Sequence, residues 1–122
     1  MFTGGYSYNV NGTTFNNNSL TGFYSVVGVL TADGRGSLSG TDTASQNGVV
    51  QTGRTFTGTY AVQLNCSGSA TLNYAGQASP APFAIAVSES GDQVAFLQTS
   101  GGAVAAGTAT RQFPRLSSSA RP

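Results

Sequence analysis

The chain has 122 residues, of which five are basic and four acidic, so its formal net charge is only +1; it contains no His and no Trp. This weak charge excludes a nucleic-acid binder that works through a basic patch. The lack of His excludes histidine-based catalysis and a His/Cys metal site, and the composition excludes a coiled coil or helical bundle.

The length is that of one domain. We expect a single domain over residues 1–113, followed by a flexible tail rich in Ser, Pro and Arg over residues 114–122. No apolar run approaches the length of a membrane helix, so no membrane insertion is expected. No leader segment is visible at the start, and Cys66 is the only cysteine, so it has no internal disulfide partner.

Apolar and polar side chains alternate along much of the chain, which is the pattern of half-buried strands. Turn signals such as Asp33–Gly36 and Asn47–Gly48 separate these stretches. In chain order, strands are predicted at residues 2–10, 20–31, 35–43, 53–65, 69–75, 82–89, 93–99 and 103–112. Most connections have the length of hairpin loops, whereas residues 11–19 and 44–52 are predicted to form longer loops.

A Thr-Gly-x-Tyr motif occurs three times, at residues 3–6, 21–24 and 57–60. It predicts three strands that bring a Gly and a Tyr to the same face, because a strand glycine permits a bend or a close approach. The copy at 57–60 lies in the clearest alternation. The side chains predicted to face the interior are Tyr6, Tyr8, Tyr24, Val26, Leu30, Phe56, Tyr60, Val62, Leu64, Leu72, Tyr74, Phe83, Ile85, Val87, Val94 and Phe96.

Eight consecutive antiparallel strands joined by short turns predict an all-β fold, a small up-and-down barrel. Closure removes exposed strand edges, which are a liability in a chain so poor in charge. The alternative is a two-sheet β-sandwich, in which the stretches 11–19 and 44–52 would cross between the sheets.

Short motifs are similar to those of known small barrels. The pair Gly4 and Tyr6 resembles the Gly-x-Trp of lipocalins and avidins, and the segments Ala32–Thr41 and Phe56–Tyr60 resemble repeats in small secreted bacterial proteins. The pattern thus resembles calycin-like and allene-oxide-cyclase-like eight-stranded barrels. That resemblance implies a barrel over residues 2–112. Biotin binding is not implied, because avidin-like sites rest on Trp residues that this chain lacks.

The predicted interior either fills a solid core or lines a pocket. The second interpretation gives a lumen with aromatic walls and a few Tyr hydroxyls, a mixture typical of small-molecule sites. Arg54 and Arg111 are predicted at strand ends near a barrel mouth, where a guanidinium could bind a ligand carboxylate. The candidate ligand-binding residues are Tyr24, Arg54, Phe56, Tyr60, Tyr74 and Phe96.

Residues 20–31 are apolar on both faces. If Tyr24 and Val26 face inward, then Phe23, Val27 and Val29 lie on the outer face. An outward apolar stripe on a surface with little charge favours association. These three residues are therefore predicted to form the interface of a homo-oligomer.

Three functions suit these features. The first is a secreted, periplasmic or cell-surface barrel that binds a small hydrophobic ligand, the compartment being inferred from a surface rich in Ser, Thr, Asn and Gly and devoid of Lys. The second is a self-assembling fibre or surface-layer subunit with a solid core. The third is a cofactor-free cyclase of the allene-oxide-cyclase-like type, in which positioning does the catalysis. No cofactor is expected, and the lack of a nucleophile constellation favours a binding role over an enzymatic one.

Overall fold

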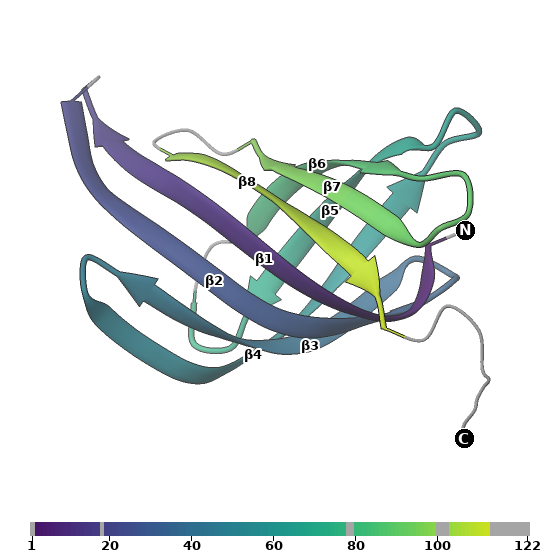
Figure 1. Ribbon diagram of the computed structural model, residues 1–122, viewed down its shortest axis with the longest axis horizontal. Coiled ribbons are helices and arrows are strands. Elements are labelled where there is room, and N and C mark those ends of the chain that lie inside the picture. Colours follow the sequence, from purple (N-terminus) through teal and green to yellow (C-terminus); the bar gives the residue numbers. More distant parts are fainter. Residues whose placement is uncertain (1, 18, 78–79, 100–102, 113–122) are drawn as a thin grey trace.

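A computed structural model describes residues 2–17, 19–77, 80–99 and 103–112, so the predicted tail at 114–122 lies outside the described residues. The chain forms a closed antiparallel barrel in which each strand pairs with the next and β8 pairs with β1 (Figure 1). Within the described ranges no helix is long and apolar enough to cross a membrane. The strands are β1 (Thr3–Asn16), β2 (Ser19–Asp33), β3 (Ser37–Gln46), β4 (Val49–Val62), β5 (Ser67–Tyr74), β6 (Ala81–Val87), β7 (Gln93–Gln98) and β8 (Ala103–Arg111).

The predicted fold class is confirmed, and the alternative sandwich is wrong because its two proposed crossovers are hairpins. β1 and β2 stay paired up to Asn16 and Ser19, and β3 and β4 meet around a tight turn at Asn47–Gly48. Both turn residues have positive φ, at 52° and 86°, as a two-residue hairpin turn of the mirror-image type requires. The end of β1 (residues 11–16) and the start of β2 (residues 19–21) have no buried side chain, so they lack the apolar alternation that marks a strand.

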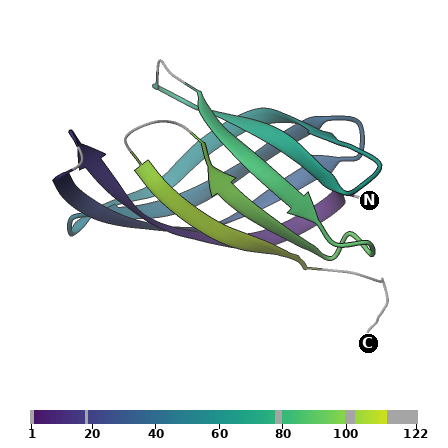
Figure 2. The same ribbon diagram turned by 90° about the horizontal axis from the view of Figure 1, so that it is seen from above.

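The barrel has one closed end, at which the hairpins β2–β3, β4–β5 and β6–β7 gather (Figures 1 and 2). Phe2 and Tyr6 are almost fully buried there, and their rings meet edge to face at 5.1 Å. The ring of Tyr60 lies 4.8 Å from that of Phe2, and its hydroxyl donates a hydrogen bond to the Phe2 carbonyl oxygen. These three aromatic side chains plug the closed end.

Most of the predicted interior is buried as expected, but the assignment of Leu64 is wrong. Its side chain is fully exposed, and Val62 is 37% exposed. β4 ends at Val62, and hydrogen bonds between Gln63 and Ser67 and between Cys66 and Gln63 turn the chain there. The period-2 pattern therefore continues in the sequence beyond the last strand residue.

The three motif copies bring their tyrosines Tyr6, Tyr24 and Tyr60 into the barrel, as predicted. The glycine of the third copy, Gly58, permits a close approach of two strands. A Cβ at Gly58 would lie 2.3 Å from the carbonyl oxygen of Thr71 on β5. That distance is shorter than real Cβ contacts, so glycine is needed there for β4 and β5 to pack as they do.

A β-bulge in β4 sets the orientation of two polar side chains. Asp42 of β3 pairs with Arg54, whereas Ala44 pairs with Gln51, so one extra β4 residue is accommodated between the two pairs. Gly53 lies in the bulge with a φ of 63°, a conformation that favours glycine. Regular alternation would point Arg54 and Gln51 to opposite faces, but the bulge turns both into the barrel.

Candidate functional site

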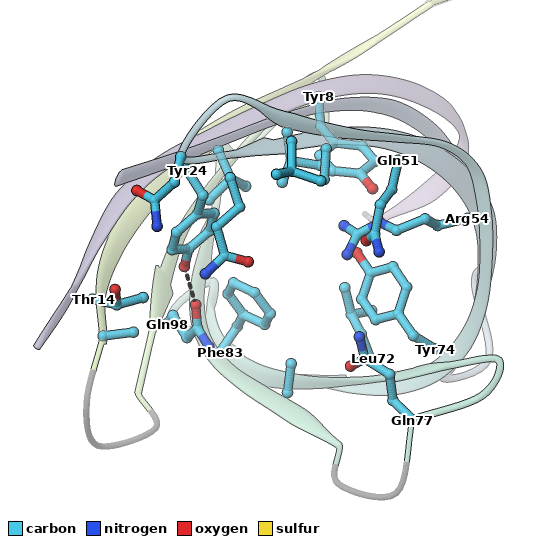
Figure 3. A pocket seen from close by; sticks show the side chains of 18 residues that line it. Tyr8, Thr14, Tyr24, Gln51, Arg54, Leu72, Tyr74, Gln77, Phe83 and Gln98 are labelled. Atoms are coloured by element: carbon cyan, nitrogen blue, oxygen red, sulfur yellow. Dashed lines mark hydrogen bonds between the residues drawn. The ribbon is translucent and has the colours of Figure 1, made fainter. Parts of the chain in front are cut away.

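The half of the barrel opposite the closed end contains a cavity of about 540 Å³. All eight strands contribute to its wall, and it lies toward the end of the barrel at which β1, β3, β5 and β7 end, which we call the open end. Figure 3 shows the side chains around the central space. The lining residues are Tyr8, Val10, Thr14, Tyr24, Val26, Ala44, Gln46, Asn47, Val49, Gln51, Arg54, Leu72, Tyr74, Gln77, Ala81, Phe83, Gln98 and Ala103.

Behind one wall of the cavity lies Asp42, whose side chain has no exposed surface. Its Oδ1 accepts a hydrogen bond from Nε of Arg54 at 2.7 Å. Its Oδ2 accepts hydrogen bonds from the hydroxyls of Tyr8 at 2.8 Å and Tyr74 at 2.5 Å. A buried carboxylate is tolerated only when it is paired and hydrogen-bonded, and these three donors meet that requirement.

Arg54 lies between Asp42 and the cavity. Its guanidinium carbon is 4.4 Å from the ring centroid of Tyr74, which is a cation–π contact. The side chain is 22% exposed and lines the cavity (Figure 3). Within the described part of the chain, Nε is its only nitrogen with a hydrogen-bond acceptor, so the two terminal Nη groups have no protein acceptor.

The protonation states in this cluster follow from burial and from the Asp42 charge. Burial raises the pKa of Tyr8 far above its usual value, and the neighbouring Tyr74 and Asp42 raise it further. The pKa of Tyr74 is also raised, by burial first and then by its hydrogen bond to Asp42. Burial alone would lower the pKa of Arg54, but the hydrogen bond to Asp42 and its charge outweigh that effect and raise it. The two phenols thus stay neutral donors, and Arg54 stays a cation.

The opposite side of the cavity carries a second polar pair. The hydroxyl of Tyr24 donates a hydrogen bond to Oε1 of Gln98 at 2.6 Å (Figure 3). Burial raises the pKa of Tyr24, so this hydroxyl also stays protonated. Carboxamides recur among the lining residues: Gln46, Asn47, Gln51, Gln77 and Gln98.

Apolar side chains fill the rest of the wall. Val10, Val26, Leu72 and Phe83 line the cavity between the two polar clusters. The first three are almost completely buried, and Phe83 is partly buried against the core. The site therefore combines apolar walls with a few polar groups in fixed positions, the usual composition of a small-molecule site.

Of the six residues predicted to bind a ligand, three line the cavity and three do not. Tyr24, Arg54 and Tyr74 line the cavity. Phe56 and Phe96 are not lining residues, and they pack around the ring of Tyr8 at 6.3 and 6.4 Å. Tyr60 belongs to the plug at the closed end, away from the cavity.

The two arginines predicted near a mouth are placed differently. Arg54 lies inside the barrel rather than at a strand end, because β4 begins five residues earlier, at Val49. Arg111 lies at the closed end, where it contacts the hydroxyl of Tyr6 and the carbonyl oxygen of Gly91 and forms an ion pair with Asp92 at 3.6 Å. Only Arg54 of these two is therefore available to a molecule in the cavity.

Sequence reasoning missed Asp42, the residue that organises the polar cluster. The signal is present in the sequence: Leu38, Gly40 and Asp42 share one face at period 2, and Leu38 is buried. A carboxylate at such a position predicts a buried acidic group that needs a basic partner. Among the described residues, no group of three or more His, Cys, Asp or Glu side chains is arranged to hold a metal ion.

The outer face of β2 carries the stripe predicted as an interface. Phe23 and Val27 are both 61% exposed, and Val29 is 44% exposed. Their outward orientation agrees with the prediction, and Tyr24 and Val26 on the same strand face the cavity.

No protein-family model and no curated protein matches this chain. Among solved structures, the barrel is similar to a de novo designed fluorescence-activating β-barrel, with a TM-score of 0.60. The two sequences are 13% identical, and the alignment covers 91% of this chain and 94% of the designed one. At this level of identity the likeness shows a shared fold alone.

Proposed function

We propose that this protein binds a small, mainly apolar molecule inside the open half of the barrel. The observation that carries the proposal is the cavity of about 540 Å³, which lies within the size range of small-molecule sites. Apolar side chains supply most of the binding free energy in such sites, and a few polar groups fix the orientation of the ligand.

The rigidity of the wall supports this proposal. Asp42 holds Tyr8, Arg54 and Tyr74 in place through three hydrogen bonds, so these groups do not need to be ordered when a ligand enters. A preformed site avoids the entropic cost of immobilising side chains during binding. The aromatic plug also closes the far end, which gives the cavity a floor.

The designed barrel is a second, weaker support, because its description as fluorescence-activating implies that a barrel of this fold can act on a fluorophore. The Lys-free, charge-poor surface supports a further proposal, that the protein works outside the cytoplasm. Detection of the full-length chain in the medium or periplasm of its native cell tests that location.

Titration with the neutral, polarity-sensitive dye Nile red tests the binding proposal. We expect saturable binding with a blue-shifted emission, since the dye would leave water for an apolar cavity. Ala81→Trp on β6 should weaken binding about tenfold or more, because Ala81 lines the cavity and a Trp would occupy its volume.

Ala84→Trp is the matched control, since Ala84 lies on the same strand but is exposed on the outer face. It should bind the dye as the unmodified chain does. Equal loss in both variants would contradict a binding site in the lumen, and so would the absence of saturable binding both to this dye and to smaller apolar probes.

A further inference from the structure

We infer that the ligand of this cavity is a monocarboxylic acid whose carboxylate binds the two terminal Nη groups of Arg54. The inference rests on the proposed binding function and specifies the chemical class of the ligand. It follows from the hydrogen-bond inventory of the polar cluster, the charges around the cavity and the placement of the apolar wall.

The hydrogen-bond inventory leaves the donors of Arg54 directed at the cavity. Asp42 takes only the Nε–H of Arg54, because its second oxygen is occupied by Tyr8 and Tyr74. The remaining Nη1 and Nη2 form the end-on edge of a planar guanidinium. Two parallel N–H groups on that edge match the two oxygens of a carboxylate in a bidentate arrangement.

The stacking of Arg54 on Tyr74 adds directionality. With the guanidinium carbon 4.4 Å from the ring centroid and Nε bonded to Asp42, both the position and the plane of the fork are restrained. A restrained fork loses less side-chain entropy when it binds an acceptor. The ligand head group should accordingly lie beside Gln51, which also lines this side of the cavity (Figure 3).

The charge exposed to the cavity favours an anion. Among the described lining residues, Arg54 is the one charged side chain, and the other polar groups are phenols, carboxamides and the hydroxyl of Thr14. The negative charge of Asp42 lies behind Arg54 with no exposed surface. Two neutral phenols also donate to that carboxylate, so a ligand in the cavity meets donors rather than the Asp42 oxygens.

A single negative charge fits better than two. Arg35 lies in the β2–β3 turn and Arg111 in β8, both at the closed end, so neither assists Arg54. Because Arg54 already balances the charge of Asp42, a phosphate dianion would leave two negative charges without a cationic partner in a partly desolvated site, whereas a carboxylate leaves one. Beyond the head group the wall is formed by Val26, Leu72 and Phe83, which suits an apolar body.

The test compares two probes of nearly equal shape, 2-naphthylacetic acid and 2-naphthylacetamide, by isothermal titration calorimetry at neutral pH. We expect the acid to bind the unmodified protein about tenfold more tightly than the amide, because charge-assisted hydrogen bonds are roughly twice as strong as neutral ones. The ratio of the two dissociation constants, rather than either constant alone, measures the role of the carboxylate.

Two variants link that ratio to Arg54. Arg54→Gln combined with Asp42→Asn removes both charges, so it leaves no unpaired buried carboxylate. This double variant should bind both probes with similar dissociation constants. Arg54→Lys keeps the charge but loses the planar fork, and should reduce the preference for the acid severalfold. Circular dichroism verifies that each variant is folded. If the double variant does not fold, the test rests on Arg54→Lys alone.

The outcomes separate the two proposals. Equal binding of acid and amide to the unmodified protein, or an acid preference that survives in both folded variants, overturns the carboxylate assignment and leaves the binding function intact. The same holds if Nile red binds and neither naphthyl probe does. If none of the three probes binds, the proposed function itself fails.

Discussion

Arg54 and Asp42 are directly opposite each other on β4 and β3, and Nε of the arginine donates a hydrogen bond of 2.7 Å to the carboxylate. The register between β3 and β4 thus brings two of the few charged residues in the chain together inside the barrel. A buried pair of this kind adds little net stability compared with apolar residues, but the loss of one partner leaves an uncompensated charge. The pair consequently makes stability sensitive to single substitutions at either position.

Asp42→Asn should lower the free energy of unfolding by about 3 kcal/mol, because it removes the buried counter-charge of the partly buried Arg54 guanidinium. Urea denaturation monitored by circular dichroism measures this change. Asp92→Asn is the control, since it removes the half-exposed carboxylate of the Asp92–Arg111 pair. That substitution should cost less than about 1 kcal/mol, as exposed ion pairs do. Equal losses in the two variants would show that the burial of Asp42 has no energetic role.

The raised pKa values of Tyr8 and Tyr74 predict a loss of stability at alkaline pH. Folding favours the neutral phenols, so their contribution is complete below the unfolded pKa of about 10 and decreases as the pH rises above it. Unfolding free energies measured by urea denaturation between about pH 8 and pH 12 should fall with increasing slope. Tyr8→Phe should reduce that slope, because one shifted group is removed.

Tyrosinate absorbance supplies the independent check on this pH dependence. The chain has five tyrosines. If all five ionised near pH 10 while the barrel stayed folded, the raised pKa values of Tyr8 and Tyr74 would be wrong.

Gly58→Ala should destabilise the barrel by about 1–3 kcal/mol, the range observed for overpacking. The added methyl would meet the Thr71 carbonyl oxygen at 2.3 Å, and backbone cannot move aside as a flexible side chain can. Gly5→Ala is the matched control, because its Cβ would meet only the side-chain oxygen of Gln112, at 3.3 Å. Thermal unfolding of both variants gives the comparison, and a Gly58 variant as stable as the control contradicts the close approach of β4 and β5.

Because Phe23, Val27 and Val29 form an exposed stripe, we predict that the protein forms a homo-oligomer. Multi-angle light scattering at micromolar concentration should give a mass above that of one chain, because a charge-poor apolar surface favours association. Val27→Glu should shift the protein to a monomer. Thr57→Glu adds the same charge to an exposed outward position on β4, and should leave the mass unchanged. A monomeric unmodified protein would refute the prediction.

Much of the fold could be predicted from the sequence, since a strand with one buried face shows its period-2 pattern directly. Phe56 and Tyr60 are examples, because both face inward where the alternation places them. The period-2 pattern gives the wrong strand boundary where the stretch of apolar alternation and the strand do not end at the same residue. Leu64 continues the alternation beyond the end of β4, and residues 11–16 form strand without an apolar face.

The site was less predictable for a different physical reason. Tyr24 and Tyr74 follow from the alternation, but the inward turn of Gln51 depends on the bulge at Gly53, which changes the phase of β4 by one residue. Single-strand periodicity also cannot pair Asp42 with Arg54, since their contact depends on the register between two strands. A search for charged residues on inward positions of neighbouring strands would have found them.

Within the described residues, the plug formed by Phe2, Tyr6 and Tyr60 closes one end of the barrel, so a ligand enters the cavity from the other end. A molecule must leave by the route through which it entered, so any side chain that narrows that end slows arrival and departure by the same factor. Substitutions at the rim, such as at Asn47 or Gln77, should then change the residence time of a ligand more than its equilibrium affinity. A change at the rim can therefore alter both exchange rates at constant affinity, whereas a change in the interior alters the affinity mainly through the dissociation rate.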